Sequence, residues 1–477
     1  MGLLSERMSK VDTAWLRMDT EANLMMIVGV WSIRPGITLT ALRERVADRL
    51  LQYPRFRQKV VEDGLLGAQW VLDRDFDIAR HVVAELPLPL RGQNRQQVLR
   101  ERVAELCSQP LDRAHPLWQF QLLEDMGDGT SALICRVHHC IADGIALIAV
   151  MLSITDGGKA PPQRRPRVAE EPDWLLDAFL RPMTNMTLKA IGLTGKGVAK
   201  GLDRVRSGAT PADATRDIAR MGLQAVSDVA AFALMPDDSP TRLKGKPGPG
   251  KTVAWDDSLA LDEVKAVGKA LGASINDVLL ACAAGAIHRY LSDRGEDPAG
   301  KQIRAMVPVN LRPLEQAWQL GNRFGLVPLV LPIGIANPVE RLCAVRARMS
   351  ELKGSFQPVM AFGLLSVAGL LIKPVQHAML NLFAKKTTAV MTNVPGPEKA
   401  LKFCGSTVEQ VMFWVPQSGD IGMGVSLLTY AGRVQFGLIT ATALCPDPEA
   451  IVANFAPEFE KLLMLSLMLP WGSEQVG

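Results

Sequence analysis

A predicted β-hairpin that runs into two adjacent histidines does most to limit how this chain can fold. Two segments with the apolar pattern of strands, WQFQLLED and SALICRVH, flank the turn sequence MGDGT. The second segment ends at His138 and His139, and the apolar segment GIALIAVMLSIT begins a few residues later with the pattern of a helix. The two histidines are therefore expected at a corner where a strand passes into a helix.

Strand and helix patterns alternate on both sides of this corner. A chain of 477 residues is too long for one simple core, so two lobes are expected. The segment 157–173 is rich in Pro, Gly and charge, and a second break precedes residue 251. We therefore predict an α/β (α+β) protein with an N-terminal lobe over 1–155, a linker and helical connection over 156–250, and a C-terminal lobe over 251–477.

Composition and charge exclude several classes of protein. The formal net charge is only +4, so no nucleic-acid partner is expected. The seven cysteines are scattered and never in a CxxC spacing, which indicates neither a disulfide framework nor a zinc site. The N-terminal segment shows no secretory signal, and the most apolar window, 359–372, is shorter than the roughly 20 residues that span a membrane. We expect a cytoplasmic protein.

A basic helical segment leaves membrane contact open. Residues 188–207, LKAIGLTGKGVAKGLDRVRS, carry five basic side chains and one acidic side chain. Such a segment fits an element that lies on an anionic membrane surface, and it fits a solvated connector between lobes equally well. Peripheral contact with the inner face of the membrane therefore remains one of two interpretations.

One segment matches the sequence pattern of a phosphate-binding loop but not its structural context. The segment GKPGPGKT, Gly245–Thr252, satisfies the Walker A spacing. A P-loop requires a hydrophobic strand before its glycines and a helix that opens at the lysine. Here a polar segment precedes, a strand-like segment follows, and two prolines stiffen the loop, so no nucleotide site is predicted.

The residue types at the histidine corner suit proton transfer. Adjacent side chains on a strand point to opposite faces, so His138 and His139 are expected to differ in role. A neutral imidazole can act as a general base. Asp143 has no serine in a nucleophile elbow nearby, so it is expected to hold the corner by pairing with a buried arginine, and Gly144 would allow close approach. The residues alone fit either a site containing a base or a structural turn.

Five short motifs carry a resemblance to a known family. HHCIADG, His138–Gly144, matches the HHxxxDG signature of the CoA-dependent acyltransferase superfamily. Four more segments, in family order and across nearly the whole chain, resemble those of bacterial wax ester synthase/diacylglycerol acyltransferases. They are HPLW (His115–Trp118), SINDVLLA (Ser274–Ala281), LGNRFG (Leu320–Gly325) and TNVPGP (Thr392–Pro397).

The resemblance implies a fold and an activity. It implies two lobes like chloramphenicol acetyltransferase, with mixed sheets flanked by helices and a channel between them. It implies transfer of a fatty acyl group from acyl-CoA to a long-chain alcohol or diacylglycerol, without a cofactor. Contact with a membrane or lipid droplet would accompany such substrates. The alternatives are the same fold acting on another acceptor, such as a polyketide alcohol or an amine, and a catalytically inactive lipid-binding protein.

The resemblance also implies roles for the residues of the corner. His139 would be the general base, while His138, Asp143 and Gly144 would shape the site. In related folds the aspartate pairs with a distant arginine. Arg57 is the candidate for that partner in this chain, with Arg55 as the second choice.

Other site residues are implied outside the corner. Asn276 and Asp277 would brace the lobe interface, and capping of the following helix is compatible with that role. Asn393 and Gly396 would line the central channel. Trp118 is expected to pack near the site without taking part in chemistry. Two apolar segments, 359–372 and 380–383, are candidate walls of the lipid pocket.

Overall fold

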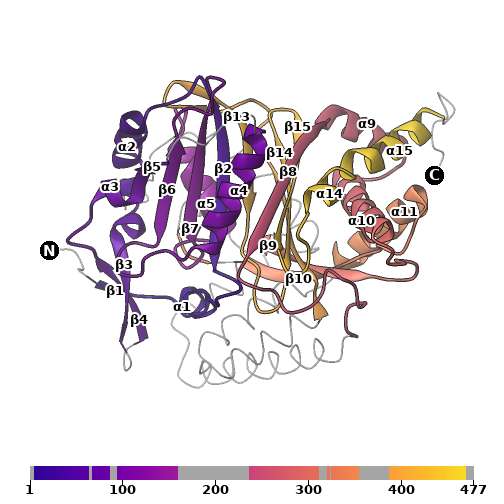
Figure 1. Cartoon of the computed structure of the whole chain (residues 1–477), viewed down its shortest axis with the longest axis horizontal. Helices are drawn as coiled ribbons and strands as arrows, with labels where there is room; N and C mark the ends of the chain where they lie inside the picture. The colour runs from indigo at the N-terminus through magenta and orange to yellow at the C-terminus, as the bar shows by residue number, and fades with distance from the viewer. Residues whose placement is uncertain are drawn as a thin grey trace, which may run out of the picture.

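Two mixed six-stranded sheets stand side by side in the protein (Figure 1). The computed structural model describes residues 5–63, 67–85, 94–158, 236–310, 320–322, 324–353 and 386–468. In each sheet most neighbouring strands are antiparallel and a minority are parallel. The predicted α/β architecture with two lobes of mixed sheet and flanking helices is therefore confirmed.

The first sheet contains the predicted hairpin. Its strands, in spatial order, are β12 (Lys402–Phe403), β13 (Ser406–Trp414), β2 (Met26–Arg34), β7 (Ser131–His138), β6 (Trp118–Leu123) and β5 (Val82–Ala84). β6 and β7 are antiparallel neighbours, as predicted, and β7 also pairs with β2 so that His138 lies opposite Met26. The last residue of a central strand is therefore the first of the two histidines.

Helices cover both faces of this sheet, and every position of β7 is therefore buried. Leu133, Cys135 and Val137 share one core with α5 (Gly144–Ser153), whereas Ile134 on the other face shares a core with α4 (Arg95–Ser108). The remaining elements of this lobe lie around the sheet. They are α1 (Lys10–Arg17), α2 (Leu39–Asp48), η1 (Leu50–Gln52), η2 (Pro54–Arg57), α3 (Ile78–His81) and a small sheet of β1 (Ser5–Arg7), β4 (Gly67–Leu72) and β3 (Gln58–Asp63).

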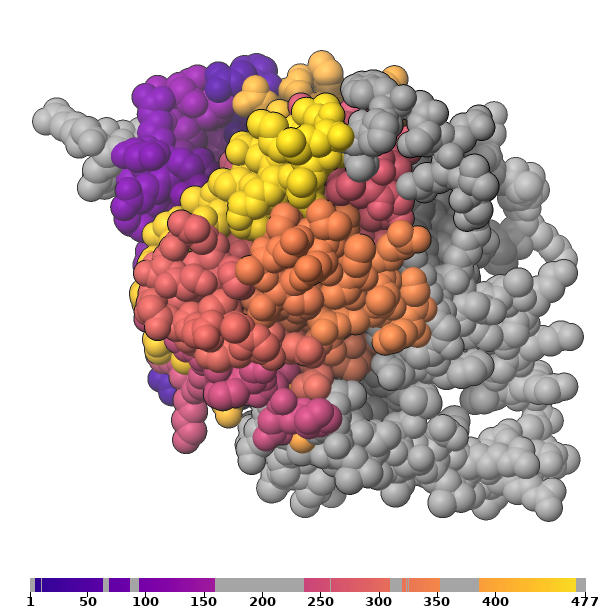
Figure 2. Space-filling model, turned by 90° about the vertical axis from the view of Figure 1, so that its right-hand side faces the viewer, coloured from indigo at the N-terminus to yellow at the C-terminus, as the bar shows by residue number. Residues whose placement is uncertain are grey.

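The second sheet is built from later segments of the chain. Its strands, in spatial order, are β10 (Phe324–Leu331), β9 (Ile303–Asn310), β11 (Ala389–Pro395), β14 (Met423–Tyr430), β15 (Arg433–Ala441) and β8 (Lys251–Ala260). Its helices are α9 (Leu261–Ala270), α10 (Ile275–Asp293), α11 (Pro338–Lys353), α14 (Glu449–Val452) and α15 (Phe455–Leu467). Figure 2 shows α15 in yellow beside α11 in orange.

The predicted start of α10 is confirmed. Ser274 is the N-cap, and its hydroxyl accepts a hydrogen bond from the backbone N–H of Asp277 (3.2 Å). The Asp277 carboxylate in turn accepts from the Ser274 N–H (2.9 Å), which completes a capping box. The helix that follows is almost entirely buried because it runs through the core of the second lobe.

The predicted boundary at residue 251 does not separate the two sheets. β12 and β13 come from the second half of the chain, yet β13 pairs with β2 over most of its length and extends the first sheet. The strand was missed in the sequence because its residues, STVEQVMFW, alternate irregularly and give no sign of which sheet they join. The first lobe is therefore built from both halves of the chain, because residues 402–414 complete its sheet.

The other sequence-based expectations concern local segments. Lys251 begins strand β8 and no helix opens there, so the Walker A spelling is not a P-loop. All seven cysteines are free thiols. Taken singly, none of the helices in the described ranges has the length and apolar character of a membrane span, although α9 and α10, bent by 100°, meet the criterion as a pair. The segments 188–207, 359–372 and 380–383 lie outside the described residues.

Candidate active site

The two histidines are held at the end of β7 by backbone hydrogen bonds to two different segments. The N–H of His138 donates to the carbonyl of Leu117 (2.9 Å), just before β6. The N–H of His139 donates to the carbonyl of Met25 (2.7 Å), just before β2. The chain then turns, since the N–H of Ile141 donates back to the carbonyl of His138 (3.0 Å). The predicted corner from strand to helix is confirmed.

The ring of His138 is enclosed by polar partners. Its Nδ1 accepts the backbone N–H of Cys140 (3.1 Å), so the neutral ring carries its proton on Nε2, which donates to Asp19 Oδ2 (3.2 Å). Asp19 also accepts from Arg113 (2.9 Å) and from the N–H of Met25 (2.6 Å). Burial opposes ionisation of Asp19, but these hydrogen bonds and the charges nearby outweigh it and lower its pKa. Both nitrogens of His138 are therefore occupied.

The ring of His139 lies among apolar and aromatic groups. It stacks on Trp15 with ring centres 4.1 Å apart and lies 5.5 Å from the ring of Phe324. Its Nδ1 is buried and makes no hydrogen bond to the residues that the structure describes. Burial lowers the pKa of His139 to about 4, although the negative charge of Asp143 acts in the opposite direction. The imidazole is thus neutral at pH 7 and can accept a proton.

A clamp formed by Asp12 and Asn322 fixes the backbone of His139. The amide nitrogen of the Asn322 side chain donates to the carbonyl of His139 (2.8 Å) and to Asp12 Oδ1 (2.7 Å). The backbone N–H of Asn322 donates to the same carboxylate oxygen (3.1 Å). Gly321, at φ +105°, forms a parallel bridge with Ala142 in the corner. Residues from α1 and from the segment 320–322 therefore meet at the corner.

This clamp was missed in the sequence. The motif LGNRFG contains Asn322, but it entered the prediction only as a mark of resemblance. Asp12 and Trp15 lie on the short helix α1, and the sequence analysis assigned neither residue to the site. No periodicity links α1 to residues more than 300 positions later, so only the folded chain reveals this contact.

Asp143 begins α5. Its Oδ1 accepts the N–H of Ala146 (2.9 Å), which makes it the N-cap of the helix, and its side chain is buried. The predicted ion pair with Arg57 is not formed: Arg57 ends η2 with an exposed side chain, and no ion pair in the described part of the chain joins it to Asp143. The second choice, Arg55, instead pairs with Glu6 (3.1 Å) and lies over the ring of Trp70. The prediction of an Arg57 partner is therefore wrong.

His139, Asp143 and Gly144 line a cavity between the two lobes, here called the catalytic cavity. Its opposite wall comes from the second sheet, including Phe324 on β10 and Asn393 on β11. Gly144 has open space on its side-chain side, since a Cβ added there would meet no atom within 4 Å. The structure thus brings His139, Asp143, Gly144 and Asn393 together around one space.

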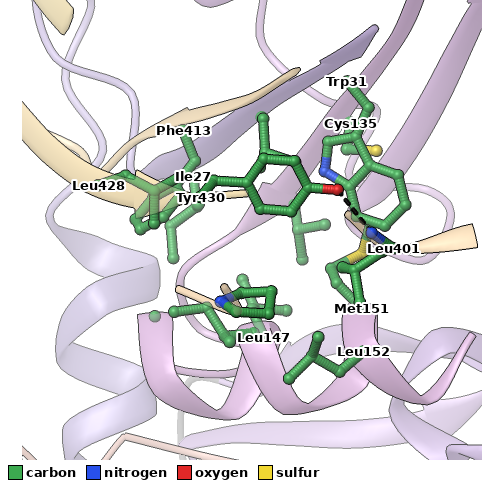
Figure 3. A pocket seen from close by; sticks show the side chains of 16 residues that line it. Ile27, Trp31, Cys135, Leu147, Met151, Leu152, Leu401, Phe413, Leu428 and Tyr430 are labelled. Carbon is green, nitrogen blue, oxygen red and sulfur yellow. Dashed lines mark hydrogen bonds between the residues drawn. The ribbon is translucent and has the colours of Figure 1, made fainter. Parts of the chain in front are cut away.

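A second cavity, here called the apolar cavity, opens from the same place (Figure 3). It lies between α5 and the first sheet, and shares Gly144, Ile148 and Phe413 with the catalytic cavity. Figure 3 shows the ring of Tyr430 above α5, with its hydroxyl toward Leu401, whose N–H it accepts (2.9 Å). The same hydroxyl donates to the carbonyl of Val408 (2.7 Å), so it is satisfied within the wall. The lining is otherwise almost entirely hydrocarbon.

Asn276 reaches the catalytic cavity through Asn393. The side-chain nitrogen of Asn393 donates to Asn276 Oδ1 (2.9 Å), so the start of α10 braces the wall on β11. Asp277 forms the capping box of α10. Gly396 is in the turn after β11, where its N–H donates to Thr429 Oγ1 (3.0 Å). Asn276 thus braces the wall of the catalytic cavity, while Asp277 caps the helix.

Trp118 is a packing residue. It is fully buried, its indole N–H donates to the carbonyl of Phe56 (2.9 Å), and its ring stacks on that of His81 with centres 4.6 Å apart. It does not line the catalytic cavity. The backbone carbonyl of its neighbour Leu117 accepts the N–H of His138, so the HPLW segment holds the corner through its backbone.

The protein has two lobes of mixed sheet, and the HHxxxDG corner faces a cavity between them. This combination is typical of the two-lobed CoA-dependent acyltransferases. In the described ranges no group of three or more His, Cys, Asp or Glu residues is placed to hold a metal ion. Two family models match the chain. The wax ester synthase/diacylglycerol acyltransferase catalytic domain covers residues 8–279, and the C-terminal domain of the same family covers residues 320–463.

The chain therefore belongs to the wax ester synthase/diacylglycerol acyltransferase family. A protein of Mycobacterium tuberculosis described as a probable diacylglycerol O-acyltransferase, tgs1, is 26% identical over 471 residues, which is 96% of each chain. This chain is an enzyme of the acyltransferase class, like its relatives.

Solved structures support the fold. The wax ester synthase/diacylglycerol acyltransferase from Marinobacter aquaeolei VT8 matches with a TM-score of 0.66 at 19% identity, covering 96% of this chain and 98% of that chain. The first condensation domain of the calcium-dependent antibiotic synthetase matches with a TM-score of 0.58 at 12% identity, covering 98% and 97%. At these identities the likeness establishes the two-lobed fold and not the substrate.

Proposed function

We propose that this protein transfers a fatty acyl group from acyl-CoA to the hydroxyl of a long-chain alcohol, a diacylglycerol, or both. The observation that carries the proposal is the neutral imidazole of His139 at the junction of a catalytic cavity and an apolar cavity. A base and a hydrocarbon-lined space in contact suit a reaction between a hydroxyl and a lipid thioester. The names of the mycobacterial and Marinobacter proteins agree with this substrate class.

In the proposed mechanism His139 removes the proton from the acceptor hydroxyl as its oxygen attacks the thioester carbonyl. The tetrahedral intermediate then collapses, the carbon–sulfur bond breaks, and the proton held by His139 goes to the CoA thiolate. A new ester and free CoA result, so the base is regenerated. The thioester supplies the driving force, and the proposal requires no cofactor.

The surroundings of His139 favour direct attack over an acyl-enzyme. The adjacent thiol, Cys140, is fully buried, and burial together with the negative charges of Asp12 and Asp19 raises its pKa well above the ordinary value. A protonated, buried thiol is a poor nucleophile. In this proposal His138 and Asp19 hold the corner, and Asp143 fixes the start of α5.

We assign the apolar cavity to the acyl chain of the donor. The cavity follows α5 from Gly144 to Leu152, a rise of about 12 Å at 1.5 Å per residue. Burial of hydrocarbon there contributes about 0.8 kcal/mol for each methylene. The catalytic cavity, which has walls from both lobes and more polar groups, is left for the thioester and the acceptor hydroxyl.

We propose in addition that the end of α15 contacts the lipid phase from which the substrates come. Met464, Leu467 and Met468 are 64%, 55% and 81% exposed and share one helical face. Exposed apolar side chains at this spacing are typical of helices that lie on a lipid surface. Substitution of Met464 and Met468 by Ser should reduce flotation of the protein with zwitterionic vesicles, to which apolar contact is the main attraction; unchanged flotation would contradict this contact.

Release of free thiol from palmitoyl-CoA tests the proposed function. The protein is assayed with hexadecanol, with dioleoylglycerol, with a long-chain amine, or without acceptor. Thiol release that depends on either of the first two, with the ester recovered as product, supports the proposal. Turnover with the amine alone indicates the same fold with another acceptor, and no turnover with any acceptor indicates an inactive lipid-binding protein.

A further inference from the structure

Lys251 is a buried lysine whose ion-pair partner is absent from the described part of the chain. It begins β8, is 9% exposed, and donates from Nζ to Asn23 Oδ1 (2.6 Å) and Gln417 Oε1 (3.2 Å). Burial lowers its pKa to about 8, with the thiol of Cys107 acting in the opposite direction. At pH 7 most molecules therefore carry Lys251 in its charged ammonium form, which donates hydrogen bonds to two neutral amide oxygens.

Such an arrangement is costly for stability alone. A buried charge without an opposite charge loses its hydration, and hydrogen bonds to amides restore only part of that loss. A methionine of similar size would fill the same space without a charge. The two amides that bind the ammonium, those of Asn23 and Gln417, lie on two segments that both lead to the catalytic cavity. The ammonium therefore connects these two segments.

Asn23 lies in the loop between α1 and β2, residues 18–25, here called the support loop. Its side-chain nitrogen donates to the carbonyls of Gly419 (2.6 Å) and Ile421 (3.2 Å), just before β14. Its side-chain oxygen accepts from Lys251 on β8. Both partners belong to segments of the second sheet, so Asn23 ties the support loop to the second lobe.

The support loop also holds both histidines. Asp19 accepts from the ring of His138, and the carbonyl of Met25 accepts the backbone N–H of His139 (2.7 Å). Asp19 Oδ1 accepts the N–H of Met25 (2.6 Å), so the two ends of the loop are joined to each other. A displacement at Asn23 is therefore passed to both histidines.

The second amide leads to the wall opposite. Gln417 directly follows Val415 and Pro416, which line the catalytic cavity on one side and a small cavity containing Lys251 on the other. The ammonium thus joins the support loop, which holds the backbone of His139, to the segment on the opposite wall of the catalytic cavity. The Asp12–Asn322 clamp holds the other side of the same corner.

On the basis of the acyl transfer proposed above, we propose that Lys251 is a positioning residue for His139. By holding Asn23 and Gln417 together it fixes the support loop against the wall of the catalytic cavity, and so sets the distance between the base and the reacting hydroxyl. Lys251 does not touch the reactants in this proposal and acts only through the loop.

The test compares Lys251→Met with Lys244→Met. Lys244 is a matched control because it is also partly buried and held by a carboxylate, Asp238 (3.7 Å), but contacts neither the support loop nor the catalytic cavity. Loss of position at Lys251 should lower kcat about tenfold or more, since displacements of about 1 Å are known to have such effects, while KM for acyl-CoA changes less than about twofold. Lys244→Met should leave both constants unchanged.

Two further variants separate positioning from general destabilisation. Lys251→Gln keeps one amide donor, so it should retain part of the kcat lost in Lys251→Met. Asn23→Ala combined with Lys251→Met should lower kcat no further than the larger single effect, because both changes release the same loop. A folded Lys251→Met protein with unchanged kcat, or losses that add fully in the double variant, would overturn the proposal.

A spectroscopic measurement keeps this test independent of the proposed function. The chain has six histidines, so the Cε1–Hε1 resonances can be assigned by substitution. Lys251→Met should shift the resonances of His138 and His139 without any substrate. The resonance of His288, which lies on α10 with its ring against the carbonyl of Ile333, should stay in place. If the wild-type protein transfers no acyl group, the kinetic test fails with the function, whereas unmoved resonances of both corner histidines would refute the positioning role itself.

Discussion

His138 and His139 are neighbours in the chain, yet their surroundings differ in almost every respect. His138 uses both ring nitrogens in hydrogen bonds and lies against the charged pair of Asp19 and Arg113. His139 lies between Trp15 and Phe324, and its buried Nδ1 has no hydrogen-bond partner among the described residues. His138 is the last residue of β7 and His139 is the first of the turn that follows, so one sequence motif supplies an imidazole held by hydrogen bonds and an imidazole held by aromatic rings.

The comparison teaches how two equal side chains can be told apart. An imidazole with saturated nitrogens has no acceptor left for a substrate proton, whereas a desolvated neutral imidazole keeps one. The difference comes from the elements that converge on each ring: the support loop on His138, and α1 with β10 on His139. Substitutions on either side should therefore have unequal effects.

The largest effect is expected at His139. His139→Ala should lower kcat for ester formation by about 10²- to 10⁴-fold, the range that a general base contributes. Thiol release and ester formation are measured together, and circular dichroism confirms that the variant is folded. Activity within tenfold of the wild type would remove His139 from the role of base.

The next effect is expected where the two cavities meet. Gly144→Leu should place a side chain into the open space beside Gly144 and lower kcat/KM by roughly 10²-fold with palmitoyl-CoA, because the long acyl chain can no longer enter the apolar cavity and the thioester is displaced. The thermal midpoint should change little, since the new side chain enters open space. Equal losses for acetyl-CoA and palmitoyl-CoA would show that the space is not used by the acyl chain.

A smaller effect on activity and a larger one on stability are expected at His138. His138→Ala leaves the buried N–H of Cys140 without its acceptor and removes one of the donors to Asp19, and a buried polar group left unpaired costs about 1–3 kcal/mol. Catalysis should fall only about tenfold because the base itself remains, with a displaced backbone. Urea unfolding and kcat are measured on the same preparation. If His138→Ala and His139→Ala lose equal activity at equal stability, the contrast between the two rings fails.

The smallest effect is expected deep in the apolar cavity. Met151→Phe narrows the space along α5 and should reduce kcat/KM for palmitoyl-CoA relative to octanoyl-CoA about fourfold for each methylene excluded, which corresponds to about 0.8 kcal/mol. Competition between the two donors, read from the ester products, measures this ratio directly. The control is Val61→Phe on β3, which is 44% exposed to solvent, lines neither cavity and should leave the ratio unchanged.

Much of the fold and part of the site could be predicted from the sequence. The hairpin of β6 and β7, the start of α10 at Ser274 and the corner at His139 follow from local apolar patterns and capping residues. Asn393 was placed at the cavity through the family motif. These predictions succeed because each depends on residues close together in the chain or on a motif that marks one position.

The contacts between distant segments could not be predicted. β13 adds to the first sheet, Asp12 binds Asn322, and Lys251 holds Asn23, and none of these pairs leaves a periodic signal. The predicted partner of Asp143 failed for the same reason: Arg57 was chosen by residue type, but η2 ends with its side chain in solvent. Tertiary pairing depends on how the elements pack, and a single sequence does not reveal it.

The pH profile of kcat/KM tests the central claim most directly. Burial lowers the pKa of His139 from 6.5 to about 4, and the neutral ring is the active form, so activity should rise with pH through an acid limb well below pH 6.5. Stability should rise over the same window, because between about pH 4 and 6.5 the unfolded chain binds a proton at His139 that the folded chain does not. Rates are therefore corrected for the folded fraction. An acid limb near pH 4 to 5 is the predicted result, and a limb at pH 6.5 or above would contradict a desolvated His139 as the base.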